Sequence, residues 1–304
     1  MLLLTVAYEE EKEQLIYKLD MMIKHFKCLG MSIGISESIE DKMHFIKIIC
    51  DDNSYSSKFK DKFNLYISNI LYDIVVDEFG KKDILNFLSD TYFFLKSDEI
   101  SKLRQLSIEA LRGSSRIIDE DSIYCLNKKN TIIDKICNCI EENKMINING
   151  FITFRMKEFK EDLECIIDKV VEKYMVEREY DEFVKLLKYF VEIQDSKIEE
   201  VNIIIKKNGE YEVRDKQGND IFKDFISDLQ DVDNIGTSNI EDVIISGLIT
   251  NAPGKIIIHC IENSINKELI ETIRNVFTTR VEICSKCEMC KKEKIKEKTN
   301  KSRA

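Results

Sequence analysis

Hydrophobic residues follow a strand-like period at both ends of the chain and a helical period in between. Near the start, residues 2–7 form a short apolar run typical of a strand, and residues 9–29 carry apolar residues at helical spacing. Two further runs, 31–36 and 43–50, are alternating or β-branched and indicate strands. We therefore predict a βαββ arrangement for residues 1–53.

Between residues 54 and 195, apolar side chains recur at intervals of three and four residues, as on helices that pack against a core. The most regular stretch covers residues 154–194. Within it, the charged segment Glu177–Glu179 is a point at which the helix could divide into two. The pattern predicts a helical central region.

The pattern changes again after residue 195. Asn208-Gly209 lies between two apolar runs and is a strong signal for a hairpin. Pro253-Gly254 suits a type II turn between two more strands. Residues 196–283 are therefore predicted to form hairpins and a ββαβ ending. The expected elements are strands 201–205 and 211–213, a helix near 221–230, strands 243–249 and 255–260, helix 266–277 and strand 279–283.

These segments define an α+β fold class, with a helical central region flanked by small sheet-forming segments. The two sheet-forming ends could share one sheet or form two. The predicted division of the chain is an N-terminal α+β segment, a helical region, a C-terminal α+β segment and a Cys-containing basic tail that we expect to be disordered. Their bounds are 1–53, 54–195, 196–283 and 284–304.

Composition restricts the class of protein. With 43% hydrophobic residues among 304, the chain has enough apolar side chains to fold around a sizeable core. Its net charge of −10 argues against general nucleic-acid binding, which needs a basic face. Residues 286–304 differ, with eight Lys or Arg against three Glu. Nucleic acid is therefore an expected partner only through this basic tail.

The start of the chain lacks the basic segment, long apolar stretch and small-residue cleavage site of a signal peptide. No window approaches the roughly 18 apolar residues of a membrane-spanning helix. We therefore expect a soluble cytoplasmic protein with reduced thiols, without a membrane span or a disulfide framework.

Cys284, Cys287 and Cys290 form the most specific chemical motif in the chain. Two successive C-x2-C spacings allow three thiolates to converge on one metal ion or on the edge of an iron–sulfur cluster. The alternative interpretation is free thiols on a disordered tail, which a reducing compartment tolerates.

A tetrahedral site needs a fourth ligand, and the predicted topology offers one. If strands 255–260 and 279–283 are joined by a right-handed helical crossover, they run parallel and end at the same edge of the sheet. Cys260, or His259, would then approach Cys284. We predict Cys260 with the three cysteines of the motif as a zinc or iron–sulfur site.

A charged group in the central region could also have a role. At the ends of two adjacent helices, its members could form a buried ion-pair network or line a binding groove, whereas on solvated faces they would form local ion pairs. A structural role in helix docking is the prediction. The group consists of Arg155, Glu177, Arg178, Glu179 and Tyr180.

We find no catalytic motif in the sequence. Pro253-Gly254-Lys255 lacks the spacing and the following helix of a phosphate-binding loop, and neither G-x-S-x-G nor G-x-G-x-x-G occurs. No catalytic or cofactor-binding residues are therefore predicted. The sequence leaves open an enzymatic activity whose residues come together only in the folded chain.

Two segments in the helical region resemble a known family. Phe-x-x-Phe-Arg at residues 151–155 and Glu-Tyr-x-Glu-Phe-x-x-Leu-Leu-x-Tyr-Phe-Val at residues 179–191, followed by a hairpin ending in Asp215-x-x-Gly218, are similar to the YtxC-like family of sporulation proteins. The resemblance implies a role in a spore-forming bacterium and supplies no catalytic residues. The Cys284–Cys290 motif and the basic tail are not part of this family pattern.

Together these observations predict a non-enzymatic cytoplasmic protein that acts through a protein partner during sporulation. The alternative is a metal-binding redox or regulatory protein that uses the C-terminal cysteines. A nucleic-acid-associated protein that uses the basic tail is a further alternative, for which binding should fall steeply with salt.

Overall fold

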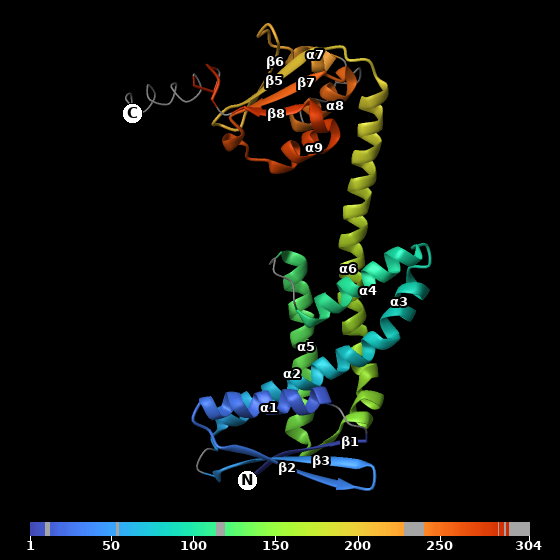
Figure 1. The fold of residues 1–304 in the computed structure, drawn as a ribbon, viewed down its shortest axis with the longest axis vertical. Helices are drawn as coiled ribbons and strands as arrows, with labels where there is room; N and C mark the ends of the chain where they lie inside the picture. The colour runs from blue at the N-terminus through green and yellow to red at the C-terminus, as the bar shows by residue number, and fades with distance from the viewer. Residues whose placement is uncertain are drawn as a thin grey trace, which may run out of the picture. The chain divides into compact units, whose positions relative to one another are not determined.

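Two compact units make up the chain, residues 1–176 and 177–304. In order of sequence, unit 1 is drawn from blue to green-yellow in Figure 1 and unit 2 from yellow to red. The computed structural model describes residues 1–9, 13–52, 55–113, 119–227, 240–284, 286–288 and 290–291.

Unit 1 contains a four-stranded sheet, sheet A, with the strand order β2-β3-β1-β4. The β1 strand pairs antiparallel with β3 and parallel with β4. The predicted βαββ start is confirmed, and β4 is an addition that is too short to show a period in the sequence. The elements are β1 (Leu2–Tyr8), α1 (Glu13–Cys28), β2 (Ile33–Glu40), β3 (Met43–Cys50) and β4 (Met145–Asn147).

Helices pack on sheet A, with α1 and α2 lying across one of its faces (Figure 1). One apolar core joins the sheet to the helices and includes Tyr8, Phe26 and Ile166. Residues 1–53 and most of the predicted helical region therefore fold as one unit. The helices are α2 (Ser57–Lys81), α3 (Asp83–Thr91), α4 (Ser97–Arg112), α5 (Glu120–Glu142) and α6 (Ile148–Ile193), the last of which continues into unit 2.

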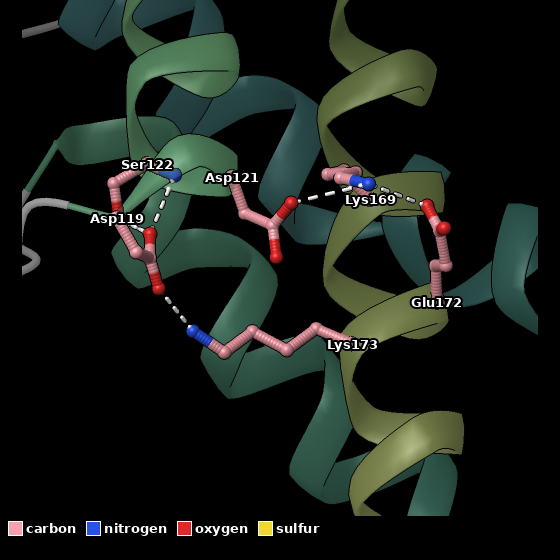
Figure 2. Close-up of polar contacts among 6 residues, drawn as sticks. All are labelled: Asp119, Asp121, Ser122, Lys169, Glu172 and Lys173. Carbon is pink, nitrogen blue, oxygen red and sulfur yellow. Dashed lines mark hydrogen bonds and ion pairs between the residues drawn. The ribbon is translucent and has the colours of Figure 1, made fainter. Parts of the chain in front are cut away.

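Charged side chains link the start of α5 to α6 within unit 1 (Figure 2). The Asp119 carboxylate caps α5 by accepting a hydrogen bond from the Ser122 amide (2.8 Å), and it pairs with Lys173 of α6 (2.5 Å). Lys169 pairs with Asp121 in the same way (3.1 Å). Hydrogen bonds from Lys173 and Ser122 hold the pKa of Asp119 well below its ordinary value. The network thus combines a helix cap with helix-to-helix ion pairs.

Unit 2 contains a second sheet, sheet B, with the strand order β6-β5-β7-β8. Here β5, β7 and β8 run parallel, and β6 pairs antiparallel with β5 at the edge. The predicted hairpin is confirmed, and Gly209 adopts the left-handed φ of 82° that its turn requires. The elements are β5 (Glu200–Ile205), β6 (Tyr211–Asp215), α7 (Phe222–Ser227), α8 (Ile240–Asn251), β7 (Lys255–His259), α9 (Lys267–Phe277) and β8 (Val281–Cys284), with short 3-10 turns at Ile261–Asn263 and Thr278–Arg280.

The predicted ββαβ ending is wrong at residues 243–249. They belong to helix α8 and do not form a strand. A short apolar run is compatible with either a buried strand or a buried helix. Parallel pairing of β5 with β7 favours the helix, since parallel neighbours need a crossover connection and not a tight hairpin. Gly247 permits close packing of α8, because a Cβ there would lie 2.1 Å from the Phe225 ring.

Two questions that the sequence left open are answered by the described residues. The α6 helix continues without interruption through residues 177–179. The sheet-forming ends of the chain build two separate sheets, A and B. The α+β fold class, with helices in the middle and small sheets towards both ends, is confirmed. Among the described helices, none combines the length and the apolar character needed to cross a membrane.

Candidate metal centre

The β7-α9-β8 crossover places two potential ligands side by side at one edge of sheet B. Its helix, α9, buries an apolar face against the sheet, including Ile273 and Phe277. The strands on either side of it run parallel, and their register pairs His259 directly with Cys284. The predicted parallel crossover is confirmed. Because directly paired residues point to the same face of a sheet, the two side chains can approach each other.

Four side chains converge at this edge. The potential ligand atoms of His259, Cys284, Cys287 and Cys290 all lie within 4.8 Å of one another. The Nδ1 atom of His259 is 3.2 Å from the Cys287 sulfur and 3.6 Å from the Cys290 sulfur. The two sulfurs are themselves 3.6 Å apart. One imidazole nitrogen and three thiols therefore surround a single point.

Local backbone geometry holds Cys287 and Cys290 in this group. The Cys290 amide donates to the Cys287 sulfur (3.4 Å), and the Lys291 amide donates to the Cys287 carbonyl (3.0 Å). The Cys290 side chain is buried. The sequence predicted a disordered tail from residue 284, and the structure differs for these cysteines because they pack against His259. Residues 292–304, most of the basic tail, lie outside the described residues.

A buried hydrogen bond sets the orientation of the histidine ring. The His259 Nε2 atom lies 2.9 Å from Oδ1 of Asn202, and both side chains are buried. Because an amide oxygen only accepts, Nε2 carries the proton and Nδ1 offers a lone pair towards the sulfurs. Asn202 is oriented in turn by donating to the Glu200 carboxylate (3.1 Å). This second layer was not visible in the sequence, since it depends on the β5–β7 pairing.

The protonation tendencies of the group suit a cation. Burial lowers the pKa of His259, which favours the neutral ring that can act as a ligand. Burial opposes ionisation of Cys284, but hydrogen bonds from the Lys286 and Cys287 backbone and from neighbouring thiols outweigh it and lower its pKa. Burial raises the pKa of Cys290. The raised pKa of Cys290 opposes its ionisation, and a bound ion would favour its thiolate form.

Cys260, the fourth ligand favoured in the sequence, lies outside the four-residue group. It follows His259, so its side chain leaves the strand in a different direction, and its backbone turns into the left-handed region with φ of 56°. It is buried and contacts Cys290 through its thiol. The structure thus places the alternative, His259, where the sequence favoured Cys260.

The charged group around Arg155 does not come together at this site. Arg155 belongs to unit 1 and pairs with Glu158 one turn along α6 (2.7 Å). Arg178 forms an i,i+4 pair with Glu182 (3.9 Å), and the Tyr180 hydroxyl shares a hydrogen bond with a threonine of α9 (2.9 Å). These contacts are local ion pairs and one helix-docking hydrogen bond.

A hollow of about 500 Å³ lies beside the four-residue group. Its lining includes Glu200, Asn202, Glu282 and Lys286, together with His259 and two of the three cysteines. The hollow opens to solvent beside the group.

The fold and site define an α+β protein with a His/Cys3 group that could hold a metal ion. Comparison with known sequences adds the family. The sequence model of the YtxC-like family matches residues 65–282, and the chain therefore belongs to this family. One similar protein, "Uncharacterized protein YtxC" of Bacillus subtilis (strain 168), is 24% identical over 208 residues, which cover 66% of this chain and 69% of that protein.

No solved structure matches the chain. The family match includes His259 and ends before Cys284, so the three cysteines lie beyond the matched residues. The metal-ligating potential therefore rests on this chain's own geometry.

Proposed function

We propose that this protein is a zinc-containing, non-enzymatic protein of sporulation, in which His259, Cys284, Cys287 and Cys290 hold one structural Zn²⁺ ion. The observation that carries the proposal is the convergence of one imidazole nitrogen and three sulfurs within 4.8 Å. A Cys3His donor set is a common structural zinc site, and C-x2-C is a usual ligand spacing.

The distances favour a single ion over an iron–sulfur cluster. With Zn–S bonds of about 2.3 Å, two sulfurs on one tetrahedral ion lie about 3.8 Å apart. The Cys287 and Cys290 sulfurs are 3.6 Å apart, close to this value. The four ligands of an iron–sulfur cluster are divided between two irons in [2Fe–2S] or four irons in [4Fe–4S], and ligands of different irons lie further apart than the 4.8 Å that encloses this whole group.

Four protein ligands also favour a structural role over a catalytic one. A catalytic zinc keeps one position open for water or substrate, whereas a closed tetrahedral site does not. The ion would join the segment after β8 to the end of β7, and so would stabilise the C-terminal part of unit 2. None of the ten cysteines, each within the described residues, forms a disulfide.

Metal analysis of protein purified without oxygen tests the zinc site. We expect about one zinc per chain, lost in the variant Cys287→Ser/Cys290→Ser and kept in Cys28→Ser, which changes an exposed thiol of unit 1. A brown protein that contains iron would indicate an iron–sulfur cluster at this site and would contradict zinc. Protein without metal, after purification in zinc-supplemented buffer, would overturn the proposal.

The role in sporulation rests on membership of the YtxC-like family and is tested in cells. A strain that lacks the gene should form fewer heat-resistant spores, and the wild-type gene should restore them. Complementation with Cys287→Ser/Cys290→Ser then tells whether the zinc site is needed for that role. Normal spore counts in the deletion strain would refute the sporulation role and leave the zinc site to be judged by metal content alone.

A further inference from the structure

Two thiols of the candidate metal centre lie where a single bond can join them. The Cys287 and Cys290 sulfurs are 3.6 Å apart. The Lys291 amide donates to the Cys287 carbonyl (3.0 Å), and this hydrogen bond closes one helical turn over these residues. In such a turn, Cα atoms three residues apart lie about 5 Å from each other, within the range of about 4.4–6.8 Å that disulfides span. Cys287 and Cys290 therefore meet the backbone requirement of a disulfide.

The two thiols differ in their access to solvent. Cys287 is half-buried and lines the hollow of about 500 Å³ beside the group. Cys290 is 1% exposed. A small oxidant from solvent therefore reaches Cys287 first, with Cys290 next to it. An accessible thiolate beside a second, resolving cysteine is the arrangement found in thiols that respond to peroxide.

The proposed zinc ion prepares both sulfurs for this reaction. Cysteine binds zinc as the thiolate, and the thiolate is also the form that attacks an oxidant. We propose that Cys287 and Cys290 form a redox pair, which peroxide converts into a disulfide with release of the zinc ion. This inference rests on the zinc site proposed above and adds the regulation of that site.

The reaction takes place in two steps, with hydrogen peroxide as the oxidant. The Cys287 thiolate attacks one peroxide oxygen, the O–O bond breaks, hydroxide leaves and Cys287 becomes a sulfenic acid. The Cys290 thiolate then attacks the Cys287 sulfur, the S–O bond breaks and a second hydroxide leaves. Two protons from solvent convert the hydroxides into water. The two sulfurs together lose two electrons to one peroxide molecule, and the charge of the zinc ion does not change.

Disulfide formation removes two of the four ligands of the ion. His259 and Cys284 alone do not complete a tetrahedral site, so the ion leaves. The link that the ion provides between the segment after β8 and the end of β7 is then lost. Reduction of the disulfide by a thiol returns both ligands, so the change is reversible. Peroxide thus decides whether the metal holds the C-terminal part of unit 2 together.

Peroxide treatment of the zinc-loaded full chain tests the redox pair. We expect wild-type protein to release about one zinc to a chromophoric chelator and to lose about two thiols per chain. Dithiothreitol should restore the thiols and zinc binding. Trypsin identifies the pair, because cleavage after Lys286 and Lys291 gives a peptide, residues 287–291, that contains Cys287 and Cys290 but not Cys284. Mass spectrometry should find this peptide lighter by two hydrogens after peroxide.

Two variants and an internal standard sharpen the test. Cys287→His keeps four ligands, since two cysteines with two histidines also form a structural zinc site, and it should hold its zinc at the peroxide dose that empties wild type. Cys260→Ala is the matched control. It removes a buried thiol that contacts Cys290 outside the four-residue group, and it should release zinc as wild type does. Cys28, an exposed thiol of unit 1, should be oxidised at least about tenfold more slowly, because an ordinary thiol is only a few per cent thiolate at pH 7.

The outcomes separate the redox pair from the zinc site. Zinc that stays bound, with peptide 287–291 unchanged at the dose that oxidises Cys28, would overturn the redox pair and keep the zinc site. A disulfide from Cys260 or Cys284 to Cys290, or equal zinc release from Cys287→His and wild type, would also overturn the pair. Protein that binds no zinc but forms the Cys287–Cys290 disulfide would overturn the zinc site and leave the redox pair standing.

Discussion

Replacing Asn202 by alanine should loosen the proposed zinc site without removing a ligand. The Asn202 oxygen lies 2.9 Å from Nε2 of His259, and both side chains are buried. In Asn202→Ala, the ring nitrogen loses this acceptor. The imidazole can then rotate or change tautomer, and its Nδ1 atom is no longer held towards the sulfurs.

The free-energy cost of Asn202→Ala can be estimated in two ways. Loss of a residue that orients a metal-ligating histidine lowers metal affinity by about 10–100-fold, or about 1.4–2.7 kcal/mol. A buried donor left without its acceptor costs about 1–3 kcal/mol. We therefore expect the dissociation constant for zinc to rise by about one to two orders of magnitude.

The assay is a competition titration of zinc between the purified full chain and a chromophoric chelator at pH 7. Asn202→Asp retains an oxygen acceptor and should bind zinc more tightly than Asn202→Ala. Asn251→Ala is the control for a buried amide, because Asn251 donates to the Gly247 carbonyl in the same unit (3.0 Å) and lies outside the four-residue group. Its zinc affinity should equal that of wild type.

Zinc binding by Asn202→Ala as tight as that of wild type would contradict an orienting role for Asn202. An equal loss of affinity in Asn251→Ala would also count against it, since the effect would then come from general destabilisation of unit 2. Urea unfolding of the zinc-loaded variants separates stability from affinity.

Three further changes probe the fold. Gly247→Ala should destabilise unit 2 by about 1–3 kcal/mol in urea, because the added methyl group meets the Phe225 ring at 2.1 Å; an unchanged midpoint would contradict the packing. Tyr72→Phe should cost about 1–3 kcal/mol by removing the buried hydrogen bond to the Leu111 carbonyl (2.7 Å), and equal stability would mean that the bond contributes nothing. Asp119→Ala should lower the melting temperature more at pH 7 than at pH 3. The folded pKa of Asp119 is depressed, so its contribution is present above the ordinary pKa of 3.8 and is lost as the pH falls through the folded value; an equal effect at both pH values would disagree.

Local patterns in the sequence were sufficient for most elements. The βαββ start, the helical middle and the hairpin at Asn208-Gly209 depend on periodicity and on turn residues that act over a few positions. The segment at residues 243–249 was assigned wrongly, because an apolar run of that length is compatible with both strand and helix. Only the parallel pairing of β5 with β7, which needs a crossover connection, decides for a helix over a strand.

In the candidate site too, some residues could be predicted from the sequence and others depend on strand pairing. From the sequence alone, the spacing of Cys284, Cys287 and Cys290 and the crossover rule led to a group at the end of the last two strands. The choice of His259 over Cys260 was decided by the β7–β8 register, which pairs His259 with Cys284. The Asn202 acceptor was decided by the pairing of β5 with β7.

The element types, apart from residues 243–249, the α+β class, the family resemblance and the three thiols could therefore be predicted from the sequence. The separation into sheets A and B and the fourth member of the metal group depend on how distant segments pair. The two groups of features differ in how far apart along the chain the interacting residues lie. Periodicity and turn chemistry act between neighbours, whereas register, face and burial are set by partners tens of residues away along the chain.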